Sequence, residues 1–140
     1  MARVGLFTLV LGLVMSAAGS AQTSPSAVSA WVAVPAAGAT WADAYVELKN
    51  PSMYEIFVVL ATSDASASVE LRAAAAGTAD PAVTREIAVP AYGSTDAAAS
   101  APHLRLVGLT KPLAAGDSVA ITLKTDGGDT LKVAATVRTP

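Results

Sequence analysis

The residues best suited to chemistry lie in the segment PHLRLVGLTKPLAAGD, which spans residues 102–117. It holds the only histidine of the chain, His103, and Arg105 follows two positions later. Imidazole is a common metal ligand and acid–base group, and residues two apart in a strand share a face. His103 and Arg105 are therefore expected on one side of a strand, as parts of a metal site, of a catalytic site or of neither.

A catalytic site would require a nucleophile beside His103. The nearest candidates along the chain are Ser94 and Ser100, and neither lies in a Gly-x-Ser-x-Gly context. With one histidine and no cysteine, the chain lacks most of the usual groups for acid–base and nucleophilic catalysis. The sequence therefore predicts that the protein is not an enzyme and has no catalytic residues.

The N-terminal segment predicts export. Residues 1–21 combine an early arginine, an apolar run over 4–15 and small residues at Gly19 and Ala21, which is typical of a signal peptide cut before Gln22. The alternative, a membrane anchor, is disfavoured because a bilayer span needs about 20 apolar residues. Lipid attachment through a lipobox needs a cysteine, and the chain has none. We expect a periplasmic or secreted protein without a membrane anchor in its mature form.

Charge narrows the set of partners. The formal net charge is -2, and charged residues are scattered singly along the chain. A nucleic-acid-binding surface needs a basic patch or stripe, and none is visible. Nucleic acid and anionic membrane are therefore not expected as partners.

The elements that would position these residues are short strands. Apolar and polar residues alternate with a period of two, and Gly, Pro, Asn, Ser and Asp separate the runs. Gly127 and Gly128 are expected to supply positive φ angles in a tight hairpin. We therefore expect a flexible leader over residues 22–27 and one all-β domain over 28–140. This domain is predicted to be an antiparallel β-sandwich of about eight strands. The predicted strands are 30–35, 42–50, 55–61, 68–73, 85–91, one around His103, 118–124 and 130–138, with loops at 73–77 and 95–100.

The order of the motifs along the chain is distinctive. An AWV strand is followed by a tyrosine-containing strand that ends in KNP, by VELR, by IAVPAYG and by HLRLVGLTKPLAAGDSVAITL. This order, over residues 28–137, resembles the PCuAC family of periplasmic copper chaperones. The last segment is similar to that family's signature of His, Leu, Met, Leu, Met-Gly-Leu, a basic residue and Pro-Leu, then Gly-Asp. The resemblance implies a cupredoxin-like β-sandwich, Cu(I) binding through His and Met, and copper delivery toward cytochrome oxidase.

The resemblance also implies which residues would hold copper. His103 matches the histidine of the family's His-x-Met pair, and Arg105 takes the place of its methionine. Arg72 takes the place of the first histidine, and no methionine lies in residues 77–84, where a further ligand is expected. Cu(I) prefers thioether and imidazole, and guanidinium stays protonated in proteins. Two such cations about 6 Å apart repel by roughly 3 kcal/mol at an effective dielectric of about 20.

We therefore expect Cu(I) binding to be weak or lost, with His103 as the sole remaining ligand position. Copper is the ligand that the resemblance implies, but no tightly bound cofactor is expected. The alternative function is a metal-free periplasmic binding or accessory module on the same scaffold. The expected partner is a periplasmic protein of a copper pathway or of oxidase assembly.

Interpretations without a copper site are also open for the same residues. His103 fits a surface or half-buried strand residue, or a weak Cu(II) or Zn(II) contact, which a carboxylate within about 4 Å of its ring would favour. Arg72 and Arg105 fit solvated strand-end cations, or a small anion site where the metal would lie. Trp31, Trp41 and Tyr45 are expected in the core or capping its end.

Overall fold

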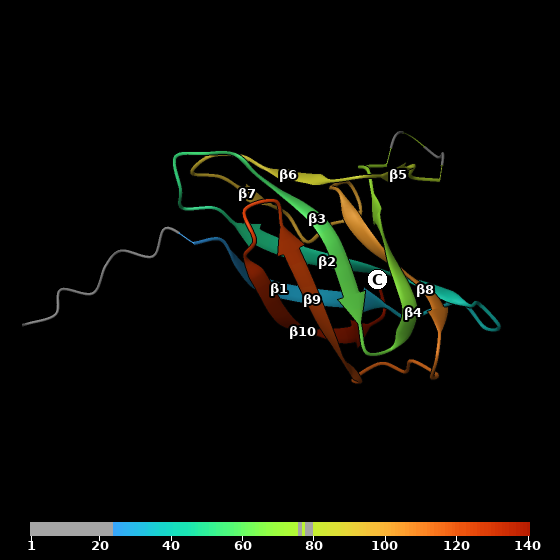
Figure 1. Cartoon of the computed structure of the whole chain (residues 1–140). Coiled ribbons are helices and arrows are strands. Elements are labelled where there is room, and N and C mark those ends of the chain that lie inside the picture. The colour runs from blue at the N-terminus through green and yellow to red at the C-terminus, as the bar shows by residue number, and fades with distance from the viewer. Residues whose placement is uncertain (1–23, 76, 78–79) are drawn as a thin grey trace, which may run out of the picture.

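The computed structural model describes residues 24–75, 77 and 80–140. These residues form ten β-strands and no helix (Figure 1), which confirms the all-β prediction. The predicted signal peptide over 1–21 lies outside the described residues, as do the first two residues of the predicted leader. The first strand begins at Ser26, inside that leader and two residues before the predicted start of the domain. In the described part of the chain, no helix has the length and apolar character needed to cross a bilayer.

Each of the predicted strand regions overlaps a strand of the structure. Two strands that were not predicted are β5 and β7, which have two residues each and so carry no visible alternation. The strands are β1 (Ser26–Ala33), β2 (Trp41–Lys49), β3 (Ile56–Ser63), β4 (Ser66–Arg72), β5 (Val83–Thr84), β6 (Ile87–Val89), β7 (Ser94–Thr95), β8 (His103–Leu109), β9 (Ser118–Thr125) and β10 (Thr130–Arg138).

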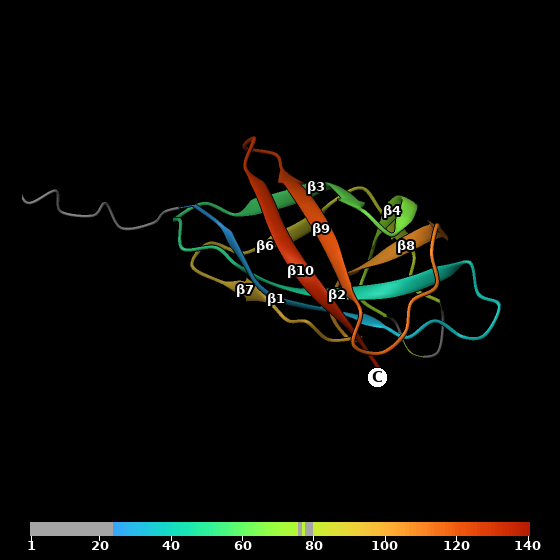
Figure 2. The same cartoon turned by 90° about the horizontal axis from the view of Figure 1, so that it is seen from below.

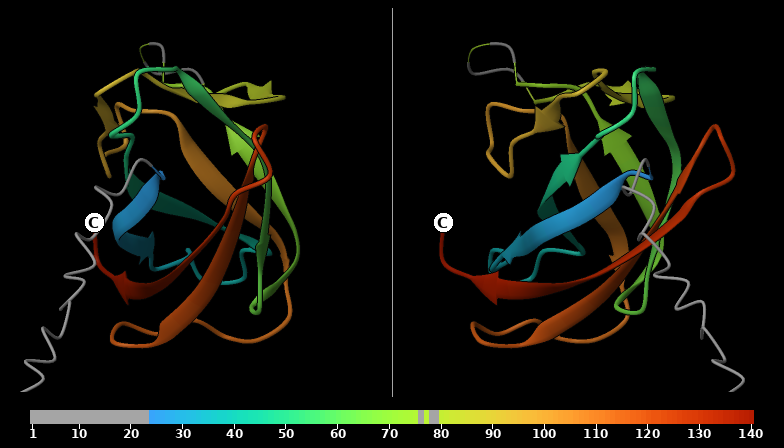
Figure 3. Two further views of the ribbon diagram at one scale, coloured as in Figure 1. Left: turned by 60° about the vertical axis from the view of Figure 1, so that its left-hand side comes forward. Right: turned by 90° about the vertical axis from the view of Figure 1, so that its left-hand side faces the viewer.

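The strands form one strongly curled sheet. Its order is β5-β4-β8-β2-β1-β10-β9-β3-β6, and β7 pairs with β2 outside this path. Figure 3 shows the sheet rolling round until β3 and β4, near its two ends, lie side by side. The ladders are antiparallel, as predicted, except that β1 and β10 pair in parallel. β1 and β10, the first and last strands along the chain, are neighbours in the middle of the sheet and are not joined by a hairpin, so no turn forces them to run antiparallel.

Alternate side chains of the strands fill the interior of the roll. On β8, Leu104 and Leu106 are buried with the core, whereas His103 and Arg105 belong to the opposite face. Burial of apolar surface on this face supplies the main driving force for folding. The most deeply buried large apolar side chains are Leu106, Ile121, Leu123, Val32, Val58, Val89, Val119 and Val137.

The predicted hairpin between β9 and β10 is present and extends beyond the rest of the sheet (Figure 2). Its turn differs from the prediction, because only Gly128 has a positive φ, of 87°, and Gly127 does not. The amide of Asp129 donates to Thr125 Oγ1 at 3.1 Å, so a threonine side chain helps to close the turn. One glycine in the left-handed region is therefore sufficient for this turn.

Gly108 is required by the backbone of β8. Its φ is +69°, and an added Cβ would lie 3.1 Å from the Cβ of Ala67. We expect Gly108→Ala to lower the free energy of unfolding by about 1–2 kcal/mol, because an L-residue is strained there and meets a neighbouring strand. Urea denaturation measures this cost. Gly127→Ala is the matched control, since its Cβ would meet no atom closer than 3.9 Å; an equal loss in both variants would contradict the prediction.

Candidate functional site

The candidate site lies where β8 runs between β4 and β2. The ladder register places Arg105 opposite Glu70 on β4 and opposite Asp43 on β2. One step along β8, His103 lies opposite Arg72. Directly opposed residues share a face of a sheet, and so do residues two apart. All five residues therefore lie on the outer face of the roll, opposite the face that carries the apolar core.

Arg105 is the centre of this arrangement and is only 6% exposed. Its Nε donates to Asp43 Oδ1 at 2.8 Å, and its Nη2 lies 3.4 Å from Asp43 Oδ2. Its Nη1 and Nη2 donate to the two carboxylate oxygens of Asp80 at 3.1 and 3.0 Å. The guanidinium also lies 4.0 Å above the ring of Trp41. The hydrogen bonds to Asp43 and then to Asp80 raise the pKa of Arg105, so its positive charge is permanent.

Arg72 is held in a similar way. It forms a short ion pair with Glu70, and its Nη1 donates to the carbonyl of Pro81 at 2.7 Å. The same nitrogen lies 3.7 Å from Asp80 Oδ2. Instead of extending into solvent, both arginines are thus neutralised by carboxylates of their own chain, which occupy the places that an external anion would take. We call Asp43, Glu70, Arg72, Asp80 and Arg105 the Arg–carboxylate cluster.

His103 is buried beside this cluster. It is only 3% exposed, so the prediction of a surface or half-buried residue is wrong. Its Nδ1 lies 3.3 Å from the carbonyl oxygen of Ala101, and its Nε2 has no hydrogen-bond partner. A carboxylate does lie within 4 Å, because Asp43 Oδ1 is 3.7 Å from Nε2. That oxygen, however, accepts the much shorter hydrogen bond from Arg105.

Asp43 and Asp80 are ionised at neutral pH. Burial raises the pKa of Asp43, but the adjacent His103 and Arg105 lower it by more, so it lies below the ordinary value. The hydrogen bonds from Arg105 hold the pKa of Asp80 below its ordinary value as well. With three carboxylates and two guanidinium groups, the cluster has a formal charge of -1.

The other candidate ligands and nucleophiles are not part of this site. Met53 lies in the connection between β2 and β3 and is exposed. Neither ring nitrogen of His103 makes a hydrogen bond to Ser94 or Ser100, because Nδ1 faces the carbonyl of Ala101 and Nε2 has no partner. Among residues 24–75, 77 and 80–140, no group of three or more His, Cys, Asp or Glu is placed to hold a metal ion.

The aromatic residues form a stack on the outer face rather than a core. The rings of Trp31 and Tyr45 have centroids 4.5 Å apart, and those of Tyr45 and His103 are 5.1 Å apart. The guanidinium of Arg138 lies 4.2 Å above Trp31. Tyr45 is buried within this stack, whereas Trp41 is 43% exposed. Tyr45 is thus buried, as expected, whereas Trp41 is not in the core, and the main core cluster is aliphatic.

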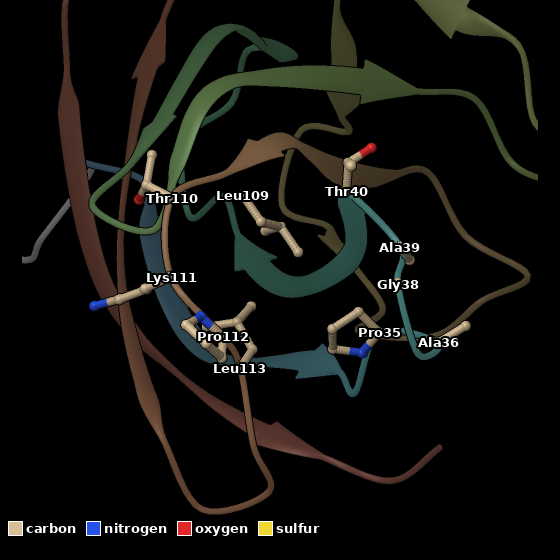
Figure 4. A pocket seen from close by; sticks show the side chains of 10 residues that line it. All are labelled: Pro35, Ala36, Gly38, Ala39, Thr40, Leu109, Thr110, Lys111, Pro112 and Leu113. Atoms are coloured by element: carbon tan, nitrogen blue, oxygen red, sulfur yellow. The ribbon is translucent and has the colours of Figure 1, made fainter.

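A cavity of about 460 Å³ lies away from the Arg–carboxylate cluster, between the β1–β2 and β8–β9 connections (Figure 4). Pro35 and Leu109 contribute apolar side chains to its wall. Lys111 is the only titratable residue that lines it, and its side chain extends away from the others in Figure 4. Its Nζ lies 4.0 Å from Asp64 Oδ2. This cavity therefore offers no acid–base pair and no metal ligand set.

Comparison with known sequences identifies relatives over most of the described chain. A family model described as "Putative lipoprotein LpqE-like" matches residues 26–137. "Putative lipoprotein Lxx21020" of Leifsonia xyli subsp. xyli (strain CTCB07) is 34% identical over 114 residues, which cover 78% of this chain and 66% of that protein. The chain thus spans just under two thirds of the length of this relative.

Comparison with solved structures identifies similar folds. The solution structure of CuI-DR1885 from Deinococcus radiodurans has a TM-score of 0.70 and 34% sequence identity, over 86% of this chain and 83% of that chain. The copper-bound PCuAC domain from PmoF2 has a TM-score of 0.69 over 83% of this chain and 92% of that domain. Its sequence identity is 22%, so this second likeness concerns the fold alone.

Proposed function

Because the chain belongs to the LpqE-like family and has the cupredoxin-like fold of PCuAC copper-chaperone domains, we propose that it is an exported binding module that holds Cu(I) weakly or not at all. The single observation that carries this proposal is the position of Arg105. It stands where the family resemblance implies a methionine ligand, and its guanidinium is fixed between Asp43 and Asp80.

The chemistry of this position opposes copper. Cu(I) needs soft ligands, and guanidinium offers no lone pair to a metal. An ion bound to His103 Nε2 would lie beside Asp43 Oδ1, which already accepts a hydrogen bond from the guanidinium of Arg105. The side chain opposite His103 is a second arginine, Arg72.

On this proposal the protein acts as a metal-free binding or accessory module. Its partner would be a periplasmic protein of a copper pathway or of oxidase assembly, recognised through the outer surface of the domain. Export is supported by the description of the family as lipoprotein-like. Fractionation of cells that express the full chain tests export, and retention of the protein in the cytoplasm would contradict it.

A second candidate is a weak Cu(II) or Zn(II) contact. The observation that favours it is the unpartnered Nε2 of His103, only 3.7 Å from a carboxylate oxygen of Asp43. Imidazole and carboxylate suit these harder ions better than Cu(I). The contact would be weak, because Asp43 is shared with Arg105.

Anaerobic titration with Cu(I) against a competing chelator tests the proposal. We expect the chelator to keep the copper, which means that the domain binds Cu(I) with a dissociation constant weaker than about 1 µM. The D. radiodurans protein, whose structure contains Cu(I), is the positive control. Stoichiometric binding tighter than that limit would refute the proposal. If Cu(II) or Zn(II) binds, His103→Ala should abolish it, and persistence of binding would place the ion elsewhere.

A further inference from the structure

A second cavity, of about 260 Å³, adjoins the Arg–carboxylate cluster. The β1–β2 connection forms one wall and the first residues of β2 form another; Figure 4 shows Pro35 and Ala36 in this connection, and both of them line this cavity too. The polar and aromatic groups of the wall are Asp43, Trp41 and Tyr45. The rest of the lining is apolar and small: Ala33, Val34, Pro35, Ala36, Ala39, Ala42 and Pro140.

The charge of this wall is negative. Asp43 contributes an ionised carboxylate whose pKa lies below its ordinary value, despite the burial that raises it. The hydrogen bond from Arg105 to Asp43 Oδ2 is long, at 3.4 Å, so this oxygen retains capacity to accept another hydrogen bond. Arg105 does not line the cavity, and its charge is shared between Asp43 and Asp80.

The aromatic groups are fixed before any ligand arrives. Tyr45 is held between Trp31 and His103, at centroid distances of 4.5 and 5.1 Å. Burial, and then the charge of Asp43, raise the pKa of Tyr45, so its hydroxyl stays protonated. Arg105 covers one face of Trp41, which is nevertheless 43% exposed, and the indole therefore keeps surface open to a ligand.

An indole, a phenol and a carboxylate around a small apolar cavity form the combination that recognises ammonium groups. The surface of Trp41 that Arg105 leaves open attracts a cation through the quadrupole of the indole, and the carboxylate of Asp43 supplies the opposite charge. Tyr45, whose ring is stacked on both sides, and the apolar wall cover the alkyl groups. The volume is below the usual range of about 300–1,000 Å³ for drug-sized ligands, so the ligand must be small.

We propose that this cavity, lined by Trp41, Asp43 and Tyr45, binds an alkylammonium group. The group could belong to a free small amine or to a lysine side chain of a partner protein, and both share the chemistry that the cavity recognises. This site goes beyond the proposed function, since it does not depend on whether His103 contacts a metal.

Titration of the unmodified domain with choline, followed through the indole N–H resonance of Trp41, tests the site. We expect saturable binding that is roughly tenfold tighter than for 3,3-dimethylbutan-1-ol, the neutral compound of the same shape, because only choline gains the cation–π and ionic attraction. A second titration, with Nα-acetyl-lysine N-methylamide in the same assay, tests a lysine side chain as the ligand.

Binding of choline alone indicates a free amine, and binding of the lysine derivative alone indicates a partner's side chain. Binding of both supports the class. Failure of both to saturate by about 50 mM, or equal binding of the neutral alcohol, would overturn the proposal.

Two variants locate the site on the protein. Trp41→Leu keeps an apolar side chain without the quadrupole, and Asp43→Asn removes the charge; each is expected to weaken binding by roughly tenfold. Asp96→Asn makes the same change of charge at an exposed position and should bind as the unmodified domain does. Asp43→Asn also removes a partner of Arg105 and could prevent folding. In that case, the comparison of choline with its neutral counterpart on the unmodified domain decides whether the charge of the ligand matters. Equal binding by Trp41→Leu and by the unmodified domain would place the ligand elsewhere and overturn the proposal.

Discussion

The double variant Arg72→His and Arg105→Met is expected to bind Cu(I) at least about a hundredfold more tightly than the unmodified domain. The introduced imidazole would lie opposite His103 in the ladder, and the introduced thioether two residues beyond it on the same face of β8. These are the soft ligand types that Cu(I) prefers. The substitutions also remove two permanent cations and leave Asp43 and Asp80 to attract an incoming cation. Anaerobic competition against a Cu(I) chelator measures the gain.

The matched control replaces both arginines by leucine. Arg72→Leu with Arg105→Leu removes the same charges but adds no ligand, so it separates the loss of repulsion from the gain of coordination. Adding His103→Ala to the His/Met variant should remove most of the gained affinity. If the folded His/Met variant binds no better than the leucine variant, copper cannot be restored at this position, and the assignment of the family's ligand positions to Arg72 and Arg105 is wrong.

The strands could be predicted because a half-buried strand shows its two faces in the sequence. The alternation in β9 and β10 fixes both strands and the hairpin that joins them. Alternation carries no information about strand direction, and the parallel pairing of β1 with β10 was therefore missed. The two-residue strands β5 and β7 are too short to show any period.

The candidate site could be predicted only in part. The motif resemblance indicated His103, Arg72 and Arg105, but not the carboxylates that neutralise the arginines. Glu70 could have been found, since it lies two residues before Arg72 and shares its face. Asp43 becomes a neighbour of Arg105 only through the pairing of β2 with β8, and its place in the site depends on a register that the sequence does not state.

The burial of His103 has the same kind of cause. The outer face of a β-strand is exposed unless other segments cover it, and no local pattern tells which segments do. Here the buried Tyr45 packs against the imidazole, and the loop that carries Asp80 is tied to Arg105. Both contacts join residues distant in the sequence, so the local sequence predicts a more exposed histidine than the fold produces.

Arg105→Met alone is expected to lower the free energy of unfolding by about 2–3 kcal/mol, because it leaves a carboxylate unpaired. The side chain of Asp43 is only 18% exposed and would lose its hydrogen bonds to Arg105. Asp80 is 68% exposed and can return to water, so its share of the cost is small. Arg85→Met makes the same chemical change at an exposed position and should stay within about 0.5 kcal/mol of the unmodified domain. Urea denaturation at neutral pH measures both.

The pH dependence of this loss identifies its cause. In the unmodified domain the pKa of Asp43 lies below its ordinary value of 3.8, so the stability that this carboxylate contributes is present above that pH and is lost as the pH falls through the lowered pKa. Without Arg105, burial is opposed by His103 alone, and the pKa of Asp43 in the folded variant must be higher than in the unmodified domain. The variant therefore takes up a proton at a higher pH, and the stability difference between the two proteins must shrink as the pH falls toward 3.

Adding Asp43→Asn to Arg105→Met should likewise recover part of the loss at neutral pH, since an amide needs no counter-charge. A loss that is independent of pH and unchanged in the double variant would show that Arg105 stabilises the fold by packing against Trp41 rather than by neutralising Asp43.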